Sequence, residues 1–572
     1  MKGRYLLIIF LLSLFLLGIT KVVDTDAWMH LSIGREIFNL KGLPATEPFV
    51  YPMFGKPFAY SSWLFALIYY MAYLAFNVYG VILLKAITIT AAFYILIRDS
   101  LLPKKNYIVS IAVMSVIVIM ARYRFVVRPD TFLMMFLPFS IYALNAYIYE
   151  NKKYIYALPF VDMLWANSHS SINLMFVPFL SFIVGGILQQ YISKKLNTHH
   201  PSPVTYFPYT PTTAQLKTIT LVFLASFAAS LISPYFITQY TAGAGVMASD
   251  WWKQEIMELA KPTWQTNKWP FLMTAAIAVS FMLNWFSAYR SRHNPPIPPL
   301  AKGGKGGFEP SLIHLFLVIP FVVLSFTALR FVFLLGIVSG PVLARNLSIF
   351  IDDSRSLKRL FHKKALIAVV SAWIILYTAL GLSGVEPFGN KATAFGFGFD
   401  YSFVPEGAMK YMDKRNITGR VFNLFQWGQY ITWRDFPKRT AFVDGRGYLP
   451  VDLLEKQDLA RRRPSVLDEL YKRYRFKSIL VEYPVDDAGI SDVLYNTDLA
   501  LSDPRWALVY WDDLSLVYLK RGGVYDSIIK KDEYRFVKPA NNISGTRARL
   551  HDKNYRENLI RELKRNIKET GS

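Results

Sequence analysis

Two carboxylates lie close together near the start of the chain, in the segment KVVDTDAWMHLSIGREI that follows a long apolar run. A charged side chain near hydrocarbon costs a few kcal/mol, so Asp24 and Asp26 require either water or a chemical role. A carboxylate can take the proton of a hydroxyl group, which makes both residues candidate general bases. If this segment is helical, Asp26 and His30 are four residues apart on one face and could hold a water molecule, a substrate hydroxyl or a divalent cation. Spacing alone does not establish a metal site, and the sequence indicates no certain cofactor.

A second set of candidate residues is basic. The segment ARYRFVVRPD contains Arg122, Arg124 and Arg128 followed by Asp130, and the segment TALRF contains Arg330. An arginine side chain stays charged and donates parallel hydrogen bonds, which suits the oxygen atoms of a phosphate group. We therefore regard these four arginines as candidate phosphate ligands and Asp130 as a candidate substrate-binding residue. The alternative is that the arginines pair with neighbouring aspartates or with lipid head groups.

Two further polar candidates follow an apolar run in the segment DMLWANSHSSIN, which contains Asn167 and His169. A single histidine in a loop is more often a hydrogen-bonding residue than a catalyst. Asn167 and His169 are therefore candidate substrate-binding residues for which a structural role is the alternative. A tryptophan-rich loop, ASDWWKQEIMELAKPTWQTNKW, follows further along the chain and is predicted to lie on the outer side of the membrane, as the arginine segments are.

The composition indicates what kind of protein positions these residues. Of the 572 residues, 53% are hydrophobic and 18% are charged. Such a chain is too apolar for an ordinary soluble protein and is predicted to be a polytopic α-helical membrane protein. The chain has no cysteine, which excludes disulfides and thiolate chemistry. Its formal net charge of +24 fits basic cytoplasmic loops better than nucleic-acid binding, and we expect no nucleic-acid partner.

The apolar segments define the predicted membrane spans. The first, MKGRYLLIIFLLSLFLLGIT, has a basic start and no small-x-small cleavage site, so we interpret it as an uncleaved span that enters from the cytoplasm. Further apolar segments lie near 63–79, 80–98, 107–121, 131–149, 154–167, 172–190, 216–233, 269–289, 311–328, 331–348 and 364–382.

The distribution of Lys and Arg gives these spans a direction. The basic, Gly- and Pro-rich segment at 290–307 is predicted to be a cytoplasmic linker. The same rule places the two aspartates and the arginine segments outside. Few cations are expected on that side, so the presence of the arginines there suggests an anionic ligand. The same rule places Lys104 inside, so the chain must cross the membrane an odd number of times between Asp26 and Lys104. We expect 63–79 to lie along the outer interface, which leaves eleven spans; if it crosses, there are twelve.

The composition changes at about residue 383, where charge rises and apolar runs shorten. We predict a small extracytoplasmic α/β domain over 383–540 and a charged tail, helical or disordered, over 541–572. The segments GRVFNLFQWGQYITW, RTAFVDGRG and KSILVEYP alternate strand-like runs with turns, and WALVYWDDLSLVYLKR is typical of a hairpin. The segment PSVLDELYKRYR is typical of a short amphipathic helix.

Several segments occur in an order that carries a family resemblance: DTDAWMHL after the first span, then GLPATEPFVY, GKPF, SSWL, VVRPDTF, LWANSHSS, ISPYF, ALRFVFL and, in the tail, FNLFQWGQYITW with FVDGRG. This order resembles a large group of bacterial integral-membrane glycosyltransferases of the GT-C type, related to protein O-mannosyltransferases and lipid A aminoarabinose transferases. The group typically has WWHL and often NLHGG, whereas this chain has WMHL and NSHSS. These departures concern the acceptor pocket.

The resemblance implies a GT-C type module over 1–382, with the acidic motif in a first outer loop at 21–62. In the better known relatives an acidic residue of this loop is essential and the donor is a sugar on a polyprenyl phosphate. The acidic position falls here on Asp24 or Asp26, and Glu47 in the EPF segment joins the candidate substrate-binding residues. The implied partners are the polyprenyl-phosphate sugar, membrane lipid, and a glycan, lipid or protein acceptor. The implied location is the bacterial inner (plasma) membrane, with the N-terminus cytoplasmic and the C-terminal domain outside.

The leading prediction is thus a membrane glycosyltransferase that moves a hexosyl or pentosyl group from a lipid-linked donor. A transporter or flippase of a lipid-linked or anionic solute is the second prediction, although it favours midplane charges and two related halves, which the sequence does not show. A non-catalytic scaffold for envelope assembly, with the outer α/β domain holding a partner, is the third.

Overall fold

The computed structural model describes residues 2–103, 105–197, 210–241, 249–293, 311–353, 357, 364–386, 393–447, 449–483, 504–537, 539 and 544–571. The chain forms two compact units, each built from two separate stretches of sequence. The first unit comprises Met1–Val22 and Tyr60–Gly398, and the second comprises Val23–Ala59 and Phe399–Ser572. Most of the predicted linker at 290–307 lies outside the described residues.

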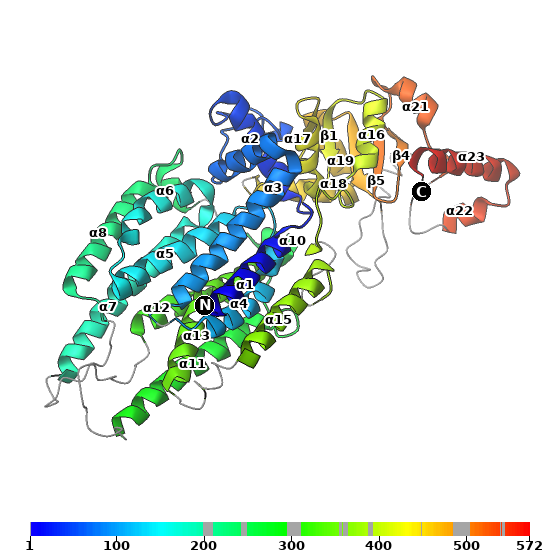
Figure 1. The fold of residues 1–572 in the computed structure, drawn as a ribbon. Coiled ribbons are helices and arrows are strands. Elements are labelled where there is room, and N and C mark those ends of the chain that lie inside the picture. Colours follow the sequence, from blue (N-terminus) through cyan, green and yellow to red (C-terminus); the bar gives the residue numbers. More distant parts are fainter. Residues whose placement is uncertain are drawn as a thin grey trace. The chain divides into compact units, whose positions relative to one another are not determined.

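The first unit is a bundle of helices (Figure 1). Its main helices are α1 (Lys2–Gly18), α3 (Trp63–Ser100), α4 (Tyr107–Ala121), α5 (Asp130–Glu150), α6 (Leu158–Ser168), α7 (Phe176–Asn197), α8 (Thr213–Ser230), α11 (Trp269–His293), α12 (Leu312–Ser325), α13 (Val332–Asp353) and α15 (Lys364–Leu382), with the short α10 (Asp250–Glu255) in a loop. Within the described ranges, eight helices are long and apolar enough to cross a membrane. The chain is therefore a multi-pass membrane protein.

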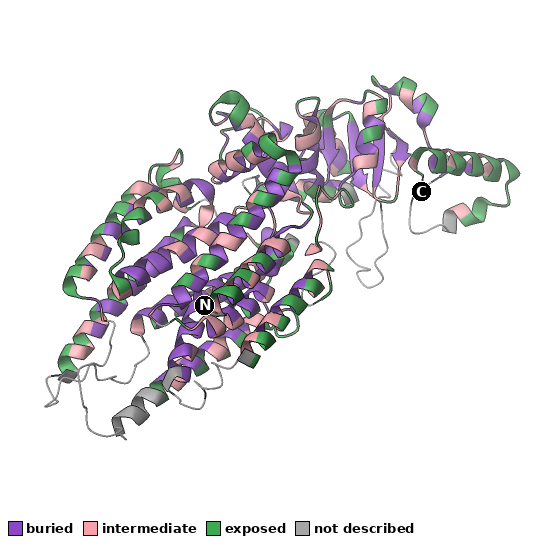
Figure 2. Cartoon of the chain, in the orientation of Figure 1, coloured by how far each residue is buried: buried purple, intermediate pink, exposed green. Residues whose placement is uncertain are grey.

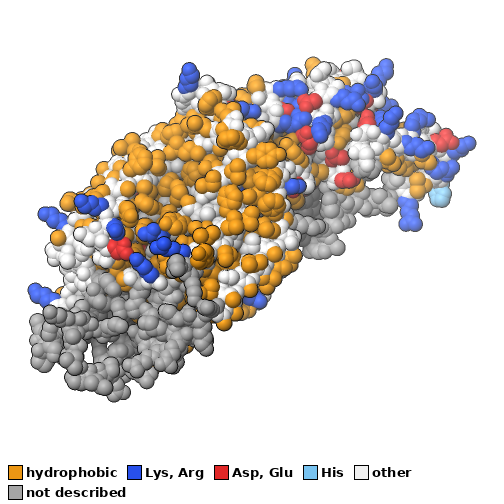
Figure 3. Space-filling model, in the orientation of Figure 1, with side chains coloured by type: hydrophobic (Ala, Val, Ile, Leu, Met, Phe, Trp, Pro, Cys, Tyr) orange, Lys and Arg blue, Asp and Glu red, His pale blue; other side chains and the backbone are white. Residues whose placement is uncertain are grey.

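Apolar side chains cover the outside of this bundle as well as its interior. Leu180, Val184 and Ile187 are exposed on one face of α7, and hydrophobic side chains cover much of the visible face of the helical unit (Figure 3). Buried residues run through the middle of the bundle (Figure 2). Helices that are apolar on all sides are typical of a protein whose solvent is lipid.

The positions of the helices match the predicted apolar segments, but fewer helices than predicted are long enough to span a membrane. The part of the chain that the structure describes has eight long apolar helices, fewer than the twelve predicted apolar segments, because α1, α6 and α12 are short and α3 joins two of those segments. The segment predicted as a span at 154–167 forms the turn η3 (Lys153–Ala157) and α6, which has 11 residues. A helix of this length extends about 17 Å, whereas the hydrocarbon core of a bilayer is about 30 Å thick.

Helix α3 holds the two segments predicted at 63–79 and 80–98. It has 38 residues with non-helical backbone angles at Phe76 and Asn77, where the helix kinks. A straight helix of that length would extend about 57 Å, nearly twice the hydrocarbon thickness. The kink lies close to the predicted boundary between the two segments. An interfacial position for 63–79 stays a prediction.

The second unit is built around a five-stranded sheet with the order β2-β1-β3-β5-β4. The strands are β1 (Gly419–Asn423), β2 (Arg439–Ala441), β3 (Ser478–Glu482), β4 (Trp506–Trp511) and β5 (Ser515–Lys520). Strand β1 pairs in parallel with β2 and β3, whereas β5 pairs antiparallel with β3 and β4. The helices of this unit are α2 (Asp26–Leu40), α16 (Glu406–Lys414), α17 (Gly428–Asp435), α18 (Val451–Arg462), α19 (Pro464–Tyr474), α21 (Asp526–Asp532), α22 (Ser544–Arg549) and α23 (Lys553–Thr570).

Side chains from both faces of this sheet are buried, because neighbouring residues of a strand point to opposite sides. Val421 of β1 belongs to a core cluster that includes Trp28 of α2. The next residue, Phe422, packs on the ring of Phe476 with the ring centroids 5.1 Å apart. The segment that follows the first span therefore contributes directly to the core of the sheet unit.

The tail contains the predicted hairpin, β4–β5, and the predicted amphipathic helix, α19. One local prediction was wrong: the strand-like run GQYITW forms helix α17. Tyr430 and Ile431 are both buried although they are adjacent in sequence, which a helix packed on two sides permits. A short aromatic run cannot be assigned to helix or strand by periodicity alone. The last segment is helical, as one of the two predicted alternatives stated.

Candidate functional site

The two candidate bases lie at the start of helix α2 in the second unit. The carboxylate of Asp24 accepts a hydrogen bond from the backbone N–H of Asp26, with Oδ1 3.0 Å from N. This contact satisfies one of the N–H groups that a helix leaves unpaired at its start. Both aspartate side chains are half-buried, whereas His30, one turn further on, is buried. The helix that places Asp26 and His30 on one face is therefore present, as predicted.

Asp26 lies near the tail segment FVDGRG. A Cβ atom placed on Gly445 would lie 3.4 Å from Oδ1 of Asp26 and 2.1 Å from the side-chain amide of Gln429. Any side chain at position 445 would therefore displace Gln429. Glycine at this position lets the backbone of the tail approach Asp26 closely.

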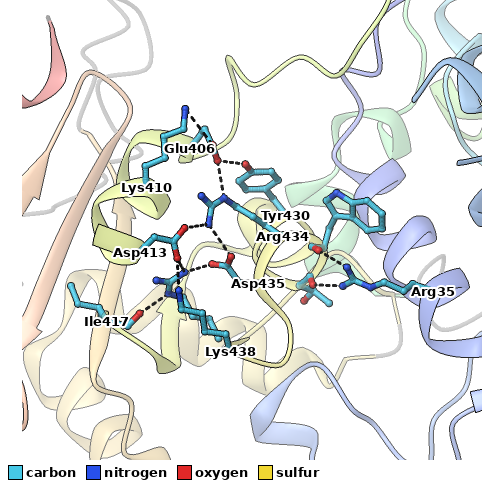
Figure 4. Close-up of polar contacts among 12 residues, drawn as sticks. Arg35, Glu406, Lys410, Asp413, Ile417, Tyr430, Arg434, Asp435 and Lys438 are labelled. Atoms are coloured by element: carbon cyan, nitrogen blue, oxygen red, sulfur yellow. Dashed lines mark hydrogen bonds and ion pairs between the residues drawn. The ribbon is translucent and has the colours of Figure 1, made fainter. Parts of the chain in front are cut away.

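Helix α17, which carries Gln429, is held against α2 (Figure 4). The guanidinium of Arg35 on α2 donates to the carbonyl oxygens of Thr432 and Trp433 at 3.1 and 2.9 Å. It also lies 4.8 Å from the ring centroid of Trp433. The side chain of Arg434 pairs with the carboxylates of Glu406, Asp413 and Asp435. These contacts fix the helix that borders the candidate base.

A buried charge cluster joins Glu47 to the same tail segment. Arg446 donates two parallel hydrogen bonds to Glu47, from Nη1 to Oε2 at 2.9 Å and from Nη2 to Oε1 at 2.8 Å. Its Nε donates to Oδ2 of Asp444 at 2.6 Å. All three side chains are at most 3% exposed. Burial raises the pKa of the Asp444 carboxyl, and the charge of Arg446 opposes that rise.

Replacing Arg446 by alanine should strongly destabilise the second unit. The change would leave Glu47 and Asp444 buried without their counter-charge, which typically costs about 3–5 kcal/mol. We expect the midpoint temperature of thermal unfolding, followed by tryptophan fluorescence, to fall markedly. The midpoint of Arg446→Lys should lie between those of the unchanged protein and Arg446→Ala, because lysine keeps the charge but loses the bidentate geometry. The matched control is Lys456→Ala, which removes an exposed pair with Glu469. Equal transitions for Arg446→Ala and the control would contradict the prediction.

In the first unit, three of the four candidate arginines converge on one carboxylate. Glu258 Oε2 lies 2.6 Å from Nη1 of Arg124 and 3.1 Å from Nη1 of Arg128. Arg330 Nη1 is 4.0 Å from Glu258 Oε1. Arg124 also pairs with Asp130. The turns η2 (Arg122–Arg124), η6 (Met257–Leu259) and η7 (Leu329–Phe331) carry three of these residues.

Asp130 connects this cluster to His169. His169 Nδ1 accepts from the backbone N–H of Ser171 at 2.9 Å, so the ring proton of the neutral form is on Nε2, which lies 3.1 Å from Asp130 Oδ1. Burial, with Arg330 and Arg124 nearby, lowers the pKa of His169 to about 3. The imidazole is therefore neutral near pH 7 and serves as a hydrogen-bond donor to Asp130.

The cluster is strongly charged. Arg124, Arg128 and Arg330 supply three positive charges, and Asp130 and Glu258 supply two negative charges. Burial alone would raise the pKa of Glu258, but the three guanidinium groups outweigh it and lower the pKa to about 2. Glu258 is therefore ionised near pH 7. Arg128 and Arg330 are 24% and 27% exposed, so their guanidinium groups are partly accessible.

Glu258 was not among the sequence-predicted residues. It lies in the tryptophan-rich loop, which no periodic pattern assigns to an element. Its charge could have pointed to it, because Glu258 is an acid in a loop predicted to lie on the same side of the membrane as the arginines.

Two other candidates of the first unit, Arg122 and Asn167, contact groups other than Glu258. Arg122 donates from Nη2 to the carbonyl oxygens of Gly381 and Thr393, both at 2.8 Å. Asn167 donates to two carbonyl groups and accepts from Trp63 Nε1 at 2.9 Å, so its amide is occupied in packing. The remaining two, His30 and Glu47, belong to the second unit. Among the described residues, no group of three or more His, Asp or Glu side chains is arranged to hold a metal ion.

Comparison with known proteins places this architecture. No protein-family model matches the sequence, and no curated protein sequence matches it significantly. The structure is similar to that of the archaeal oligosaccharyltransferase AglB from Archaeoglobus fulgidus in complex with an inhibitory peptide and a dolichol-phosphate, with a TM-score of 0.55 and 12% identity over 91% of this chain and 74% of that one. A second structure, the Archaeoglobus fulgidus oligosaccharyltransferase tethered with an acceptor peptide, gives a TM-score of 0.53 and 12% identity over 92% and 74% of the two chains. The chain thus has the fold of a GT-C type membrane protein.

Proposed function

We propose that this protein is a glycosyltransferase that moves a sugar from a polyprenyl-phosphate donor to an acceptor outside the cytoplasm. The observation that carries the proposal is the arginine cluster, in which three guanidinium groups face two carboxylates on a GT-C type fold. The neighbouring structure is a complex with a dolichol-phosphate and a peptide, which supports a lipid-linked donor and a peptide or glycan acceptor in general terms. We place the protein in the bacterial plasma membrane with a cytoplasmic N-terminus.

The reaction assigns different roles to the two groups of residues. An acceptor oxygen forms a bond to the anomeric carbon while the bond from that carbon to the phosphate oxygen breaks and polyprenyl phosphate leaves. Asp24 or Asp26 takes the proton of the acceptor hydroxyl as the new bond forms. Arg128 and Arg330 stabilise the negative charge that develops on the leaving phosphate, a contribution of about 3–4 kcal/mol per donor in comparable sites.

A reconstituted system tests the function. The purified full chain in liposomes that contain a radiolabelled polyprenyl-phosphate sugar should release polyprenyl phosphate slowly, with transfer of the label to water or to an added acceptor. A transporter or flippase would instead move intact donor between the two leaflets. A scaffold would leave both the donor and its distribution unchanged. Intact donor after prolonged incubation with a range of sugars and acceptors would contradict the proposal.

A further inference from the structure

A cationic pocket lies at the end of the helical unit that carries the N-terminus. It has a volume of about 620 Å³ and lies among the ends of α1, α3, α4 and α5. Four basic side chains line it, Arg4, Arg98, Lys105 and Lys152, against the single carboxylate of Glu150. Figure 3 shows Lys and Arg side chains gathered beside a carboxylate at one end of the helical unit, bordered by hydrophobic surface.

The described residues do not neutralise the positive charge of this pocket. Arg98 is held by neutral groups, because its Nη1 and Nη2 donate to the hydroxyl oxygens of Tyr94 and Tyr142 at 3.1 and 3.3 Å. Within the described part of the chain, none of the five charged lining residues takes part in an ion pair. Four cations against one carboxylate leave a net charge of about +3 near pH 7.

The floor of the pocket is fixed by a buried polar network. Leu102, which lines the pocket, accepts a hydrogen bond from Arg345 Nε at 2.6 Å. Arg345 also pairs with Asp99 at 3.3 Å, and both side chains are at most 4% exposed. Asn145 donates to Asp99 at 2.7 Å. These bonds tie together α3, α5 and α13, so the cationic wall is held by a rigid frame.

One wall of the pocket continues into an apolar surface. Ile8 of α1 lines the pocket and is 62% exposed. Tyr5 and Leu12 are exposed on the same face of α1, three residues before and four after it. A ligand that fills this site therefore needs a negatively charged head and a hydrocarbon part beside it.

We propose that this pocket binds an anionic glycerophospholipid, with the phosphodiester head group among the four cations and an acyl chain along the exposed face of α1. Basic pockets between transmembrane helices recognise anionic lipid head groups by this combination of charge and depth. With the N-terminus in the cytoplasm, the lipid belongs to the inner leaflet. This site is independent of the proposed transfer reaction.

Native mass spectrometry of the full chain in neutral detergent tests the proposal. The protein should retain phosphatidylglycerol in preference to phosphatidylcholine. The variant Lys105→Gln/Lys152→Gln should lower the affinity for phosphatidylglycerol about 25-fold, since each cation contributes about fivefold near a charged surface. Both side chains are exposed, so their replacement spares the packed core. The matched control is Lys153→Gln, because Lys153 is the exposed neighbour of Lys152 and does not line the pocket.

Three outcomes would overturn the assignment. The first is equal retention of the two lipids by the unchanged protein, which would remove the role of charge. The second is equal loss of phosphatidylglycerol in the double variant and the Lys153→Gln control. The third is full displacement of the lipid by inorganic phosphate, which would identify a site for a free anion without a hydrocarbon part.

Discussion

Replacing Asp24 and Asp26 together by asparagine should lower sugar transfer by about 10²- to 10⁴-fold, which is the usual contribution of a general base. Asparagine has nearly the same shape as aspartate but cannot take the proton of a hydroxyl group near pH 7. The expected loss is in kcat, because the base acts as the new bond forms and not when the donor binds. The measurement is single-turnover release of polyprenyl phosphate at saturating donor.

The structure makes asparagine the informative substitution. The side chain of Asp24 accepts a hydrogen bond at the start of α2, and asparagine serves equally well at such a position. Asp24→Asn therefore removes the charge and keeps the acceptor of this hydrogen bond, whereas Asp24→Ala would remove both. The matched control is Asp250→Asn, because Asp250 begins α10 as Asp26 begins α2 and is 88% exposed.

The single variants identify which aspartate is the base. We expect Asp24→Asn to have the larger effect, since Asp24 is nearer the first span. A larger effect of Asp26→Asn would instead favour the carboxylate beside Gly445 and Gln429. Normal turnover in both single variants and in the double variant would remove the catalytic assignment, and the half-buried aspartates would then be parts of the helix start alone.

Topology was the strongest sequence signal for the site. Charge counting placed the segments with Arg124, Arg128 and Arg330 on one side of the membrane, and the structure brings these side chains to one carboxylate. The alternative reading was correct in part, because Arg124 pairs with Asp130. Glu258 was missed because an isolated acid in an aperiodic loop carries no pattern. Only the folded chain shows that Glu258 is the carboxylate on which the three arginines converge.

Long-range pairing explains what the sequence could not supply. Glu47 and Arg446 are 399 residues apart, and a single sequence contains no information that couples them. The segment after the first span was predicted as an outer loop, whereas its Trp28 belongs to the core of the sheet unit. Local patterns were sufficient for the β4–β5 hairpin and for α19, because a tight turn and an amphipathic period are properties of neighbouring residues.

The second large effect is expected from the variant Arg128→Gln/Arg330→Gln. If these arginines stabilise the leaving phosphate, each guanidinium contributes about 10²- to 10³-fold to kcat, and the double variant should be close to inactive. Arg124 is less suited to this test, because it is only 3% exposed and pairs with both carboxylates of the cluster. The matched control is Lys261→Gln, an exposed cation three residues from Glu258 in the same loop.

A structural role for the arginines predicts a different result, and Glu258→Gln separates the two. If Arg128 and Arg330 serve only to hold Glu258, then Glu258→Gln should lower the thermal unfolding transition as the arginine variants do and leave the affinity for polyprenyl phosphate unchanged. If they serve the phosphate, removing the competing carboxylate makes the cluster more positive by one charge, and polyprenyl phosphate should bind more tightly. Arg330→Lys should then recover part of the activity, because it restores the charge without the paired donors. Unchanged binding in Glu258→Gln together with full activity in the double arginine variant would assign the cluster to packing alone.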